Sequence, residues 1–380
     1  MRIALVVEKF LRSGGGVEYA VWEIAQALLA SGDEVHVIAR EAEALDGVRL
    51  HRVRVSSLWQ PWRVWQFSRA AQKVIHAEAF DLVHGFALTE TQDVFHAGGG
   101  SHEAYLRHGY GSLGAALRRW TPRHRIRLHL ERKVARANDT LIQCVSELGA
   151  REFQDLYGVG RERIAVVPCG VDSQRFSPSQ ADSERRGLRE AWGGDAGNVW
   201  LFPGSGFQRK GLETALAALG ACEDPSARLW VVGKDEPSRW KKRARAWGVA
   251  DRVHFLGRRG DMEKIYNAAD GIILPSRYDG WGLVCLEAAS CSRPVIMSAQ
   301  CGASEILSGV ACVIDCADDV KAFAAALDHF RDAETRDQAG RAGRGIAEEY
   351  GWDRCVSSLR DLYGSIPRSR RLSSGSDESR

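Results

Sequence analysis

Residues 271–289 read GIILPSRYDGWGLVCLEAA and carry the clearest signal of the fold. The stretch begins with a short apolar run, continues through a turn that contains two glycines, and ends in an apolar segment of helical length. A continuously apolar strand is typical of a parallel sheet that is covered on both faces, because neither side of such a strand meets water. The stretch therefore predicts a strand at 271–275 that is followed directly by a helix from about residue 282.

Similar apolar runs alternate with helix-length amphipathic segments along most of the chain. Alternation of this kind predicts βαβ units with right-handed crossovers, and about eleven strands fit two sheets of roughly five to seven strands better than one. The predicted fold class is therefore α/β, with two Rossmann-like, doubly wound parallel-sheet domains. The strands are expected at 2–7, 34–39, 81–86, 139–145, 164–168, 199–204, 228–233, 253–257, 271–275, 294–298 and 311–314.

The length of the chain also indicates two domains. It has 380 residues, and a single domain usually has about 100–200. The least regular stretch is 168–198, so the domain boundary is expected there. This gives a first domain at 1–170 and a second at 171–349. Residues 367–380 are rich in Ser, Arg and Gly and are expected to form a disordered tail.

The overall charge excludes one class of partner. The chain has 52 Lys and Arg residues against 49 Asp and Glu residues, for a formal net charge of +3. A dedicated nucleic-acid binder normally needs a clearly basic domain to coat a phosphate backbone. We therefore expect no nucleic-acid partner.

The cysteines and the apolar runs indicate the cellular compartment of the protein. The nine cysteines include no C-x-x-C pair, which is typical of reduced thiols rather than of disulfides or a zinc site. The N-terminal apolar run is too short for the core of a signal peptide, and no uncharged apolar stretch approaches the ~20 residues that span a bilayer. The expected location is the cytoplasm, with peripheral attachment to the inner membrane as an option.

In open parallel sheets, ligands bind beyond the carboxyl ends of the strands, so the turns between strands and helices are the places to search. The first turn, residues 12–18, reads RSGGGVE. Its glycines allow the backbone to approach a ligand, and the helix that follows offers free N–H groups to an anion. The spacing differs from G-x-G-x-x-G, which disfavours a nicotinamide-dependent oxidoreductase. A purely structural turn remains the alternative.

The first turn of the second half, residues 202–212, reads FPGSGFQRKGL. Glycines flank the adjacent cations Arg209 and Lys210 just before a predicted helix. Backbone amides, the positive end of a helix dipole and two cations suit the binding of a diphosphate. A solvated surface pair of cations is the alternative for this turn taken alone.

The most specific turn is residues 278–288, which reads YDGWGLVCLEA. Asp279 and Glu287 stand eight residues apart on either side of one helix N-terminus, and each carboxylate can accept hydrogen bonds from sugar hydroxyls. Glu287 lies in an otherwise apolar helix start and therefore needs a partner. The alternative is a structural Glu287 that is bonded to the backbone.

The segment from Asp279 to Glu287 resembles the E-x(7)-E motif of the retaining GT-B glycosyltransferases of family 4, with Asp in place of the first Glu. Four further motifs occur in the order of that family. Within the family, the chain is similar to the bacterial lipopolysaccharide core glucosyltransferases, which share the Arg-Lys-Gly loop. The four motifs are GGGVE at 14–18, PCGVD at 168–172, GFQRKG at 206–211 and CGASE at 301–305.

The resemblance implies a GT-B fold, with an N-terminal acceptor domain and a C-terminal nucleotide-sugar domain facing across a cleft. A final helix at 350–366 would cross back onto the first domain. Glu287 would hold the donor ribose, Asp279 would face the donor sugar, and Arg209 and Lys210 would neutralise the diphosphate. The donor-binding residues implied are Gly15, Gly16, Gly204, Ser205, Arg209, Lys210, Asp279, Gly280, Trp281, Gly282, Leu283 and Glu287.

The activity implied is transfer of a hexose from a nucleotide sugar, with its configuration retained; we expect the donor to be UDP-linked and similar to UDP-glucose. The acceptor would be a saccharide of a cell-envelope glycolipid such as the lipopolysaccharide core. No D-x-D triplet occurs in the sequence, so we expect a reaction without a metal ion or another cofactor. The alternative is a catalytically silent GT-B protein that binds sugar nucleotides or supports an assembly.

One position departs from the similar core transferases. They carry an acidic residue or a histidine that faces the reacting sugar, where this chain has Gly99. His102 or His96 is expected to take that role, unless the position is unfilled. The catalytic residues implied are thus Asp279, Arg209, Lys210 and His102, and the acceptor-binding residues are Glu18, His96 and His102.

The segment 117–136 holds eight Arg and Lys residues against one Glu. Anionic lipid attracts such a segment with ~1 kcal/mol per cation, and apolar side chains can enter the interface. The alternatives are a solvated helix face and a groove for a phosphorylated acceptor. The membrane-facing candidates are Arg118, Arg119, Arg123, Arg125 and Arg127, together with the apolar Trp120, Ile126, Leu128 and Leu130.

Overall fold

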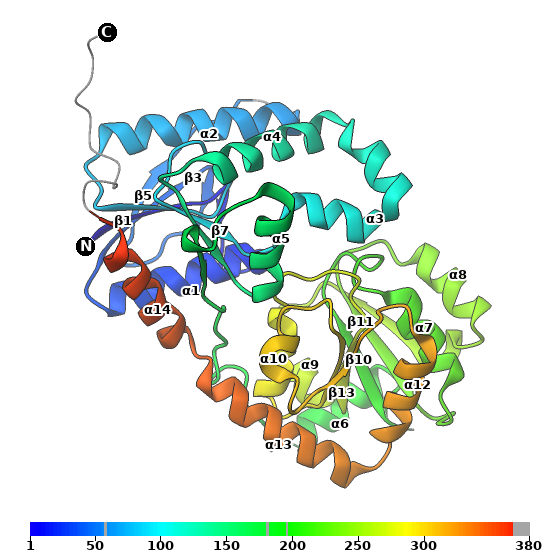
Figure 1. Cartoon of the computed structure of the whole chain (residues 1–380). Helices are drawn as coiled ribbons and strands as arrows, with labels where there is room; N and C mark the ends of the chain where they lie inside the picture. The colour runs from blue at the N-terminus through cyan, green and yellow to red at the C-terminus, as the bar shows by residue number, and fades with distance from the viewer. Residues whose placement is uncertain (57–58, 180–181, 195–196, 368–380) are drawn as a thin grey trace, which may run out of the picture. The chain divides into compact units, whose positions relative to one another are not determined.

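The structure is a computed structural model that describes residues 1–367 except 57–58, 180–181 and 195–196. The chain forms two compact units (Figure 1). The N-terminal unit consists of residues 1–169 and the chain from Trp352 onward, and the C-terminal unit consists of Gly170–Gly351. The predicted tail, apart from Pro367, lies outside the described residues.

The N-terminal unit is built on a parallel sheet of seven strands in the order β5-β3-β1-β6-β7-β8-β9. The first strand lies in the middle of the sheet and is completely buried at Ile3, Ala4 and Leu5, as expected for a strand covered on both faces. The strands are β1 (Arg2–Val6), β3 (Glu34–Ala39), β5 (Arg49–Arg52), β6 (Leu82–Gly85), β7 (Val94–Ala97), β8 (Leu141–Cys144) and β9 (Ile164–Val166), and a separate pair is formed by β2 (Lys9–Phe10) and β4 (Glu41–Ala42).

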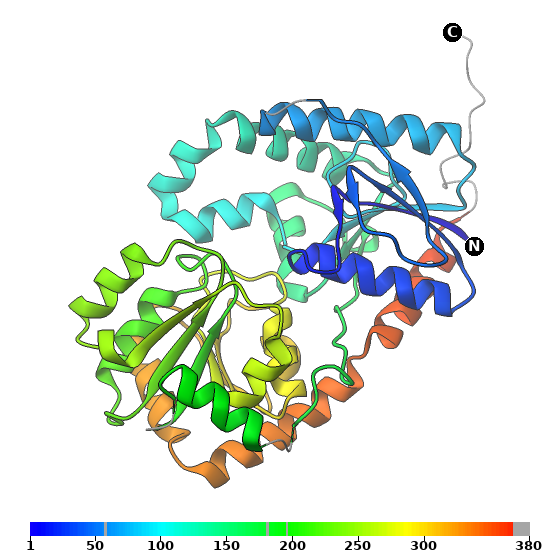
Figure 2. The ribbon, with the colours of Figure 1, turned by 180° about the vertical axis from the view of Figure 1, so that it is seen from behind.

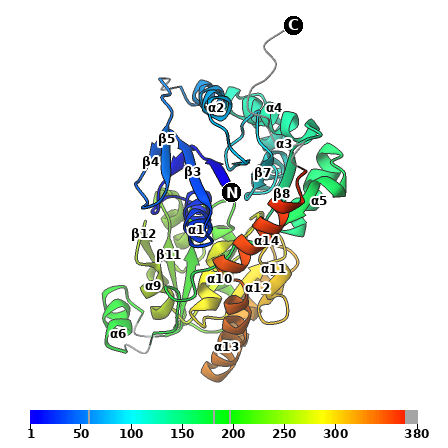
Figure 3. The same ribbon diagram turned by 90° about the vertical axis from the view of Figure 1, so that its left-hand side faces the viewer.

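Helices cover both faces of this sheet. Helices α2 and α4 pack together over one face, and α1 and α14 pack together over the other (Figures 1 and 3). Two contacts fasten α14 to the unit: Arg360 Nε lies 3.2 Å from Asp33 Oδ2, and the Tyr363 hydroxyl lies 2.7 Å from His84 Nδ1. The helices are α1 (Gly16–Ala30), α2 (Gln60–Ala77), α3 (His102–Arg119), α4 (Pro122–Arg136), α5 (Glu147–Tyr157) and α14 (Trp352–Ser365), with the 3-10 turn η1 (Arg161–Arg163).

The C-terminal unit is built on a parallel sheet of six strands in the order β12-β11-β10-β13-β14-β15. Numbered from the first strand of the unit, this is the order 3-2-1-4-5-6 of a doubly wound Rossmann sheet. The strands are β10 (Val199–Pro203), β11 (Arg228–Val232), β12 (Val253–Gly257), β13 (Gly271–Leu274), β14 (Val295–Ser298) and β15 (Cys312–Ile314).

The helices of this unit also form two layers, which Figure 2 shows from behind. Apolar side chains of α7, α8 and α12 join the strands in one continuous core, while α9 and α13 pack with α10 in the other layer and α6 packs on α9. The helices are α6 (Asp182–Ala191), α7 (Leu212–Ala221), α8 (Ser238–Ala246), α9 (Met262–Ala268), α10 (Leu283–Ser290), α11 (Ser304–Leu307), α12 (Val320–His329) and α13 (Ala333–Glu349), with the 3-10 turn η2 (Ala250–Arg252).

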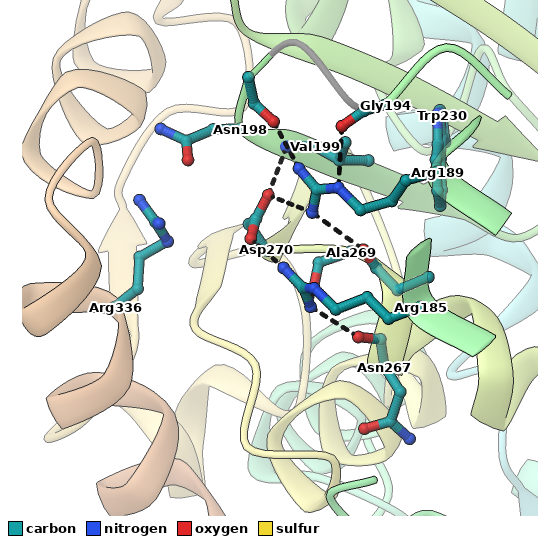
Figure 4. A network of polar contacts seen from close by, with 12 residues as sticks. Arg185, Arg189, Gly194, Asn198, Val199, Trp230, Asn267, Ala269, Asp270 and Arg336 are labelled. Atoms are coloured by element: carbon teal, nitrogen blue, oxygen red, sulfur yellow. Dashed lines mark hydrogen bonds and ion pairs between the residues drawn. The ribbon is translucent and has the colours of Figure 1, made fainter. Parts of the chain in front are cut away.

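A buried carboxylate fastens the first helix of this unit to its sheet (Figure 4). Asp270 Oδ1 lies 2.6 Å from Arg185 Nη2, and its Oδ2 lies 2.9 Å from Arg189 Nη1. The same Oδ2 accepts a 2.7 Å hydrogen bond from the backbone N–H of Val199 at the start of β10. Two cations and an amide thus satisfy this carboxylate, which ties α6 to the amino ends of β10 and β13.

The predicted fold class is confirmed, and each of the eleven predicted strands is present. The prediction missed β5 and β7 of the seven-stranded sheet and the short pair β2 and β4. Strand β5 is an edge strand that reads RLHR, so its partly exposed residues form no apolar run. Strand β7 reads VFHA and lies outside the predicted strands, and His96 is buried within it. The segment 168–198, expected to be the least regular, contains α6.

Candidate functional site

The predicted diphosphate and sugar turns of the C-terminal unit lie side by side. Strands β10 and β13 are neighbours in the sheet, and the helices that follow them, α7 and α10, lie in opposite layers. This is the switch point of a doubly wound sheet, where ligands bind beyond the carboxyl ends of the strands. The turn at 204–211 leaves β10 there, and the turn at 275–282 leaves β13.

A glycine allows the two turns to touch. Gly211 has a φ of +77°, and a Cβ on it would lie 1.8 Å from the carbonyl oxygen of Pro275. Only glycine combines this backbone conformation with so close an approach. The backbone N–H of Arg277 also donates a 2.9 Å hydrogen bond to the carbonyl oxygen of Arg209. The two turns therefore form one continuous backbone surface.

One carboxylate and two cations meet on this surface. Lys210 Nζ lies 2.8 Å and Arg209 Nη1 lies 3.8 Å from Asp279 Oδ2. The side chains of Lys210, Asp279 and Arg209 are 9%, 16% and 24% exposed. Arg209 Nη1 also donates a 2.5 Å hydrogen bond to the carbonyl oxygen of Tyr278. Since two cations face one carboxylate, the cluster carries a net positive charge and suits an anionic ligand.

This pairing lowers the pKa of Asp279. Burial by itself would raise the pKa of the carboxyl group, but Lys210 and Arg209 outweigh it and hold the pKa below its ordinary value. Asp279 is thus an ionised, hydrogen-bond-accepting carboxylate at neutral pH.

The turn that carries Asp279 is braced by the residues after β14. The N–H of Asp279 donates to the carbonyl oxygen of Gln300 at 2.9 Å, and the N–H of Gly302 donates back to the carbonyl oxygen of Asp279 at 3.0 Å. The N–H of Ala303 donates to the carbonyl oxygen of Trp281 at 2.7 Å. The side chain of Trp281 is buried, so a ligand would meet this residue through its backbone.

Glu287 is held by a tyrosine that the sequence analysis did not identify. Helix α10 begins after Gly282, as predicted, and Gly282 caps it with a φ of +89°. The buried Tyr266 hydroxyl of α9 donates a 2.7 Å hydrogen bond to Glu287 Oε2. Burial raises the pKa of Glu287. The sequence indicated that Glu287 needs a partner, and Tyr266 is that partner.

The turn after β10 is braced by the turn after β11. The hydroxyl oxygen of Ser205 accepts a 3.1 Å hydrogen bond from the N–H of Lys234, and the N–H of Gly206 donates to Asp235 Oδ2 at 2.7 Å. A Cβ on Gly204, which has a φ of +104°, would lie 2.9 Å from Cε of Lys210. Gly204 thus leaves the space that the Lys210 side chain crosses to reach Asp279.

The remaining predicted site residues belong to the N-terminal unit. Gly15 caps α1 and Gly16 is the first residue of that helix. The N–H of Gly15 donates a 3.0 Å hydrogen bond to Glu18 Oε2. Glu18, expected to bind the acceptor, is therefore engaged in capping its own helix in this structure.

The two candidate histidines lie in different surroundings. His96 is buried in β7, where Nδ1 is paired with the side-chain oxygen of Gln143, and burial lowers its pKa to about 4. His102 is the first residue of α3, and its Nε2 lies 2.9 Å from His124 Nδ1. Burial, Arg127 and other nearby groups lower the pKa of His102 to about 3. Both rings are neutral at neutral pH.

The basic segment divides between an inward and an outward face. Leu128 and Leu130 are buried, which corrects the expectation that they reach a membrane, because their side of α4 packs into the unit. Arg119 pairs with Glu103. Trp120 and Leu117, in contrast, are 78% and 67% exposed. Among the described residues, no helix combines the length and the apolar character needed to cross a membrane.

Two family models together cover most of the chain: "Glycosyltransferase Family 4" matches residues 14–175 and "Glycosyl transferases group 1" matches residues 197–332. The lipopolysaccharide glucosyltransferase WaaG of Escherichia coli (strain K12) is 27% identical over 305 residues, which are 78% of this chain and 80% of that protein. A probable transglycosylase of Burkholderia thailandensis is 30% identical over 378 residues, which are 95% of this chain and 96% of that protein.

Solved structures share the fold. The crystal structure of WaaG, a glycosyltransferase involved in lipopolysaccharide biosynthesis, superposes with a TM-score of 0.82 at 24% identity and covers 96% of this chain and 100% of that chain. Anabaena Alr3699/HepE in complex with UDP-glucose superposes with a TM-score of 0.73 at 19% identity, with 96% and 100% covered. The chain therefore belongs to the glycosyltransferase family that the two models describe, and it has the GT-B fold that its sequence predicts.

Proposed function

We propose that this protein transfers a hexose from a UDP-linked sugar to a saccharide of a cell-envelope glycolipid, with retention of configuration. The observation that carries the proposal is the cluster of Arg209, Lys210 and Asp279 at the switch point of the C-terminal unit. The complex of a structural neighbour with UDP-glucose supports the choice of donor. The similarity to a lipopolysaccharide glucosyltransferase supports the choice of acceptor.

In this proposal Arg209 and Lys210 bind the diphosphate of the donor. The nucleoside diphosphate is the leaving group, and negative charge builds on it as the glycosidic bond breaks. Cations that are already in place stabilise that charge more in the transition state than in the ground state, and this difference accelerates the reaction. Lys210 is almost buried, and a charge in such surroundings acts more strongly than one in open water.

The two carboxylates hold the sugars on either side of the diphosphate. Tyr266 occupies Oε2 of Glu287, and no described residue forms a hydrogen bond with Oε1, so that oxygen can accept from the ribose hydroxyls. Asp279 would accept from the hydroxyls of the transferred hexose. The backbone N–H groups from Gly280 to Leu283 would donate to the donor at the start of α10.

We propose that the reaction needs no metal ion or other cofactor. A divalent ion in a sugar transferase would neutralise the diphosphate, and Arg209 and Lys210 supply two positive charges for that purpose. Turnover that is unchanged by EDTA would support this part of the proposal. Loss of turnover in EDTA that is restored by added Mg²⁺ or Mn²⁺ would contradict it.

We propose that the acceptor binds to the N-terminal unit, where His102 opens α3, Glu18 lies in the first turn of α1 and His96 lies in β7. Because the rings of His96 and His102 are neutral, we propose that His102 contributes as a hydrogen-bond partner of a sugar hydroxyl rather than as a charge. His96 contacts Gln143 and Phe86. It would affect acceptor binding indirectly, by fixing the conformation at the end of β7.

A lipid-linked acceptor makes attachment to a membrane useful, and one surface supports it. Trp120 and Leu117 are the most exposed large apolar side chains described, and they lie at the turn between α3 and α4. Arg118, Arg123 and Arg125 are exposed around them. We propose that this turn rests on the anionic cytoplasmic face of the inner membrane, because aromatic and cationic side chains together favour a lipid interface.

The proposed function is tested with a panel of UDP-, GDP- and ADP-hexoses, by measuring release of the nucleoside diphosphate with and without a lipopolysaccharide-core acceptor. We expect release from a UDP-hexose that the acceptor accelerates, and a product of unchanged anomeric configuration. Binding of UDP without release from any UDP-hexose would instead identify a silent sugar-nucleotide-binding protein.

A further inference from the structure

The N-terminal part of α4 carries a second group of basic side chains. His124 is buried and Arg127 is half-buried, the exposed Arg123 lies one turn before Arg127, and His102 of α3 contacts His124. These four residues are named the Arg127 cluster here. Arg125 of the same helix is exposed and is not part of the cluster.

Arg127 has no partner for its charge. It is only partly exposed, its Nε is buried without a hydrogen-bond partner, and it forms no ion pair with any residue that the structure describes. Burial, together with the neighbouring Arg123, lowers the pKa of Arg127. Glu8, Tyr105 and Glu131 act in the opposite direction on its pKa, yet none of them pairs with it.

An enclosed arginine of this protein can be fully satisfied, although Arg293 Nε, like Arg127 Nε, is buried without a hydrogen-bond partner. Arg189, whose side chain is 15% exposed, pairs with Asp270 and donates to the carbonyl oxygens of Gly194 and Ala268. A guanidinium group withdrawn from water costs free energy unless acceptors replace the water. Arg127 lacks such acceptors, so its half-buried guanidinium group destabilises the protein when no ligand is bound.

The two histidines of the cluster lie beside this unpaired charge. Their rings stack at 5.1 Å between centroids, with a 2.9 Å contact between His102 Nε2 and His124 Nδ1. Burial, then Arg123, Arg118 and Arg127, lowers the pKa of His124. The adjacent buried carboxyl group of Glu131 does not offset the cations by pairing with them, because it accepts from the His102 N–H at 2.7 Å and from the Tyr157 hydroxyl.

The cluster lies where a ligand of this unit is expected. His102 opens α3 directly after β7 and the glycines at 98–100, and Glu8, which acts on Arg127, follows β1. Both points are at the carboxyl edge of the parallel sheet, where ligands of doubly wound folds bind. Two guanidinium groups and neutral imidazole N–H groups are donors that match the oxygens of a phosphate.

We propose that the Arg127 cluster binds a phosphate group on the acceptor saccharide. The proposal rests on the proposed function in that it assigns the ligand of the N-terminal unit to the acceptor. The bound phosphate would receive hydrogen bonds from Arg127 and Arg123 and would fix the orientation of the acceptor. Arg127 is thus a residue that destabilises the empty protein and is retained for binding, a common pattern at functional sites.

The test follows the ring C–H signals of His102 and His124 by NMR in histidine-labelled protein, so it does not depend on turnover of a donor. Glucose 6-phosphate is titrated at constant ionic strength, with glucose as the uncharged control and UDP in a separate titration. Arg127→Met is compared with Arg125→Met, a matched exposed change on the same helix.

We expect a saturable shift of both rings with glucose 6-phosphate in the wild type and in Arg125→Met, and an affinity about ten-fold or more weaker in Arg127→Met. We also expect Arg127→Met to melt at the same temperature as the wild type or higher, because an unpaired buried charge is removed.

Four results would overturn the proposal: no shift, an equal shift with glucose, an affinity unchanged by Arg127→Met, or saturation by UDP at lower concentrations, which would assign the cluster to the donor. If Arg127→Met does not fold, the exposed Arg123→Met replaces it with the same expectations for affinity. If the NMR test fails while UDP is released normally from a UDP-hexose, the phosphate site is contradicted and the proposed function is not. If glucose 6-phosphate binds as expected while no UDP is released from any UDP-hexose, only the proposed function is contradicted.

Discussion

Lys210 Nζ lies 2.8 Å from Asp279 Oδ2, and this ion pair joins two turns that are 69 residues apart in the chain. The pair stabilises the C-terminal unit, and in the proposed function it also forms part of the site that binds the donor diphosphate. Arg209, at 3.8 Å from the same oxygen, makes the cluster a net cation. The two roles of the pair can therefore be separated by comparing single and double variants.

We predict that Lys210→Met lowers the free energy of unfolding by about 1–3 kcal/mol, because Asp279 loses the nearer of its two cations in nearly buried surroundings. The double variant Lys210→Met/Asp279→Asn should recover most of this loss. Urea denaturation followed by circular dichroism measures both values. The exposed pair of Lys264 with Glu184 is the control, and Lys264→Met should change the free energy by less than about 1 kcal/mol. A double variant less stable than the single variant would argue against the pairing.

Glu287→Gln is predicted to raise stability and to weaken donor binding. Burial raises the pKa of Glu287 in the folded protein, so the folded state holds its proton more tightly than the unfolded state. Stability is therefore lost as pH rises from the ordinary pKa of 4.5 through the raised value. A glutamine side chain does not titrate, so the variant lacks this loss of stability, and its side-chain oxygen can still accept the hydrogen bond from the Tyr266 hydroxyl.

The difference in melting temperature between Glu287→Gln and the wild type should accordingly be larger at pH 7.5 than at pH 4. The dissociation constant of UDP should rise about ten-fold in the variant, since a hydrogen bond to a charged acceptor is replaced by a neutral one. Calorimetry measures the second quantity. A melting-temperature difference that does not depend on pH would contradict the conclusion that burial of the Glu287 carboxylate raises its pKa.

Gly211→Ala is predicted to cost stability and donor turnover together. The new Cβ would require a positive φ and would overlap the carbonyl oxygen of Pro275, so the turns must move apart; the backbone conformation alone costs about 1–2 kcal/mol. Gly345→Ala is the control, since a Cβ on that helical glycine meets open space and should stabilise by about 0.5–1 kcal/mol. Denaturation midpoints and rates of UDP release check both. If Gly211→Ala and Gly345→Ala changed stability and UDP release equally, the close approach of Gly211 to the Pro275 carbonyl would be contradicted.

The two Rossmann-like sheets could be predicted because their strands are apolar on both faces, and β13 shows this most clearly. The same signal was missing from β5, an edge strand whose arginines meet solvent, and from β7, where a histidine interrupts a short run. The adjacency of the Arg209-Lys210 turn and the Asp279 turn followed from the switch point of the sheet.

The partners of individual side chains could not be predicted in this way. Tyr266 reaches Glu287 from another helix, and no local pattern connects the two residues. Leu128 and Leu130 stand in a basic segment, and only the packing of α4 against its unit decides that they are buried. The unpaired state of Arg127 likewise depends on which carboxylates approach it in space, and the sequence alone does not contain that information.

Membrane association is predicted to depend on the turn between α3 and α4. The triple variant Arg118→Glu/Trp120→Ser/Arg125→Glu should bind vesicles of phosphatidylglycerol and phosphatidylethanolamine at least about ten-fold more weakly than the wild type, because it reverses two charges and removes an interfacial aromatic. Co-sedimentation measures the binding. Trp247→Ser, which removes an exposed tryptophan of the C-terminal unit, should leave it unchanged. Vesicle binding by the triple variant at the wild-type level would remove the membrane proposal.

The proposed function depends most on stabilisation of the departing nucleoside diphosphate by Arg209 and Lys210. The most direct measurement is the rate of UDP release from UDP-glucose by Lys210→Met and by the wild type, at a temperature where circular dichroism shows both to be folded. We expect a rate at least about 100-fold lower in the variant, since a fixed donor to the developing charge is lost, with a smaller change in the affinity for UDP. Release at the wild-type rate by the folded variant would contradict this stabilisation.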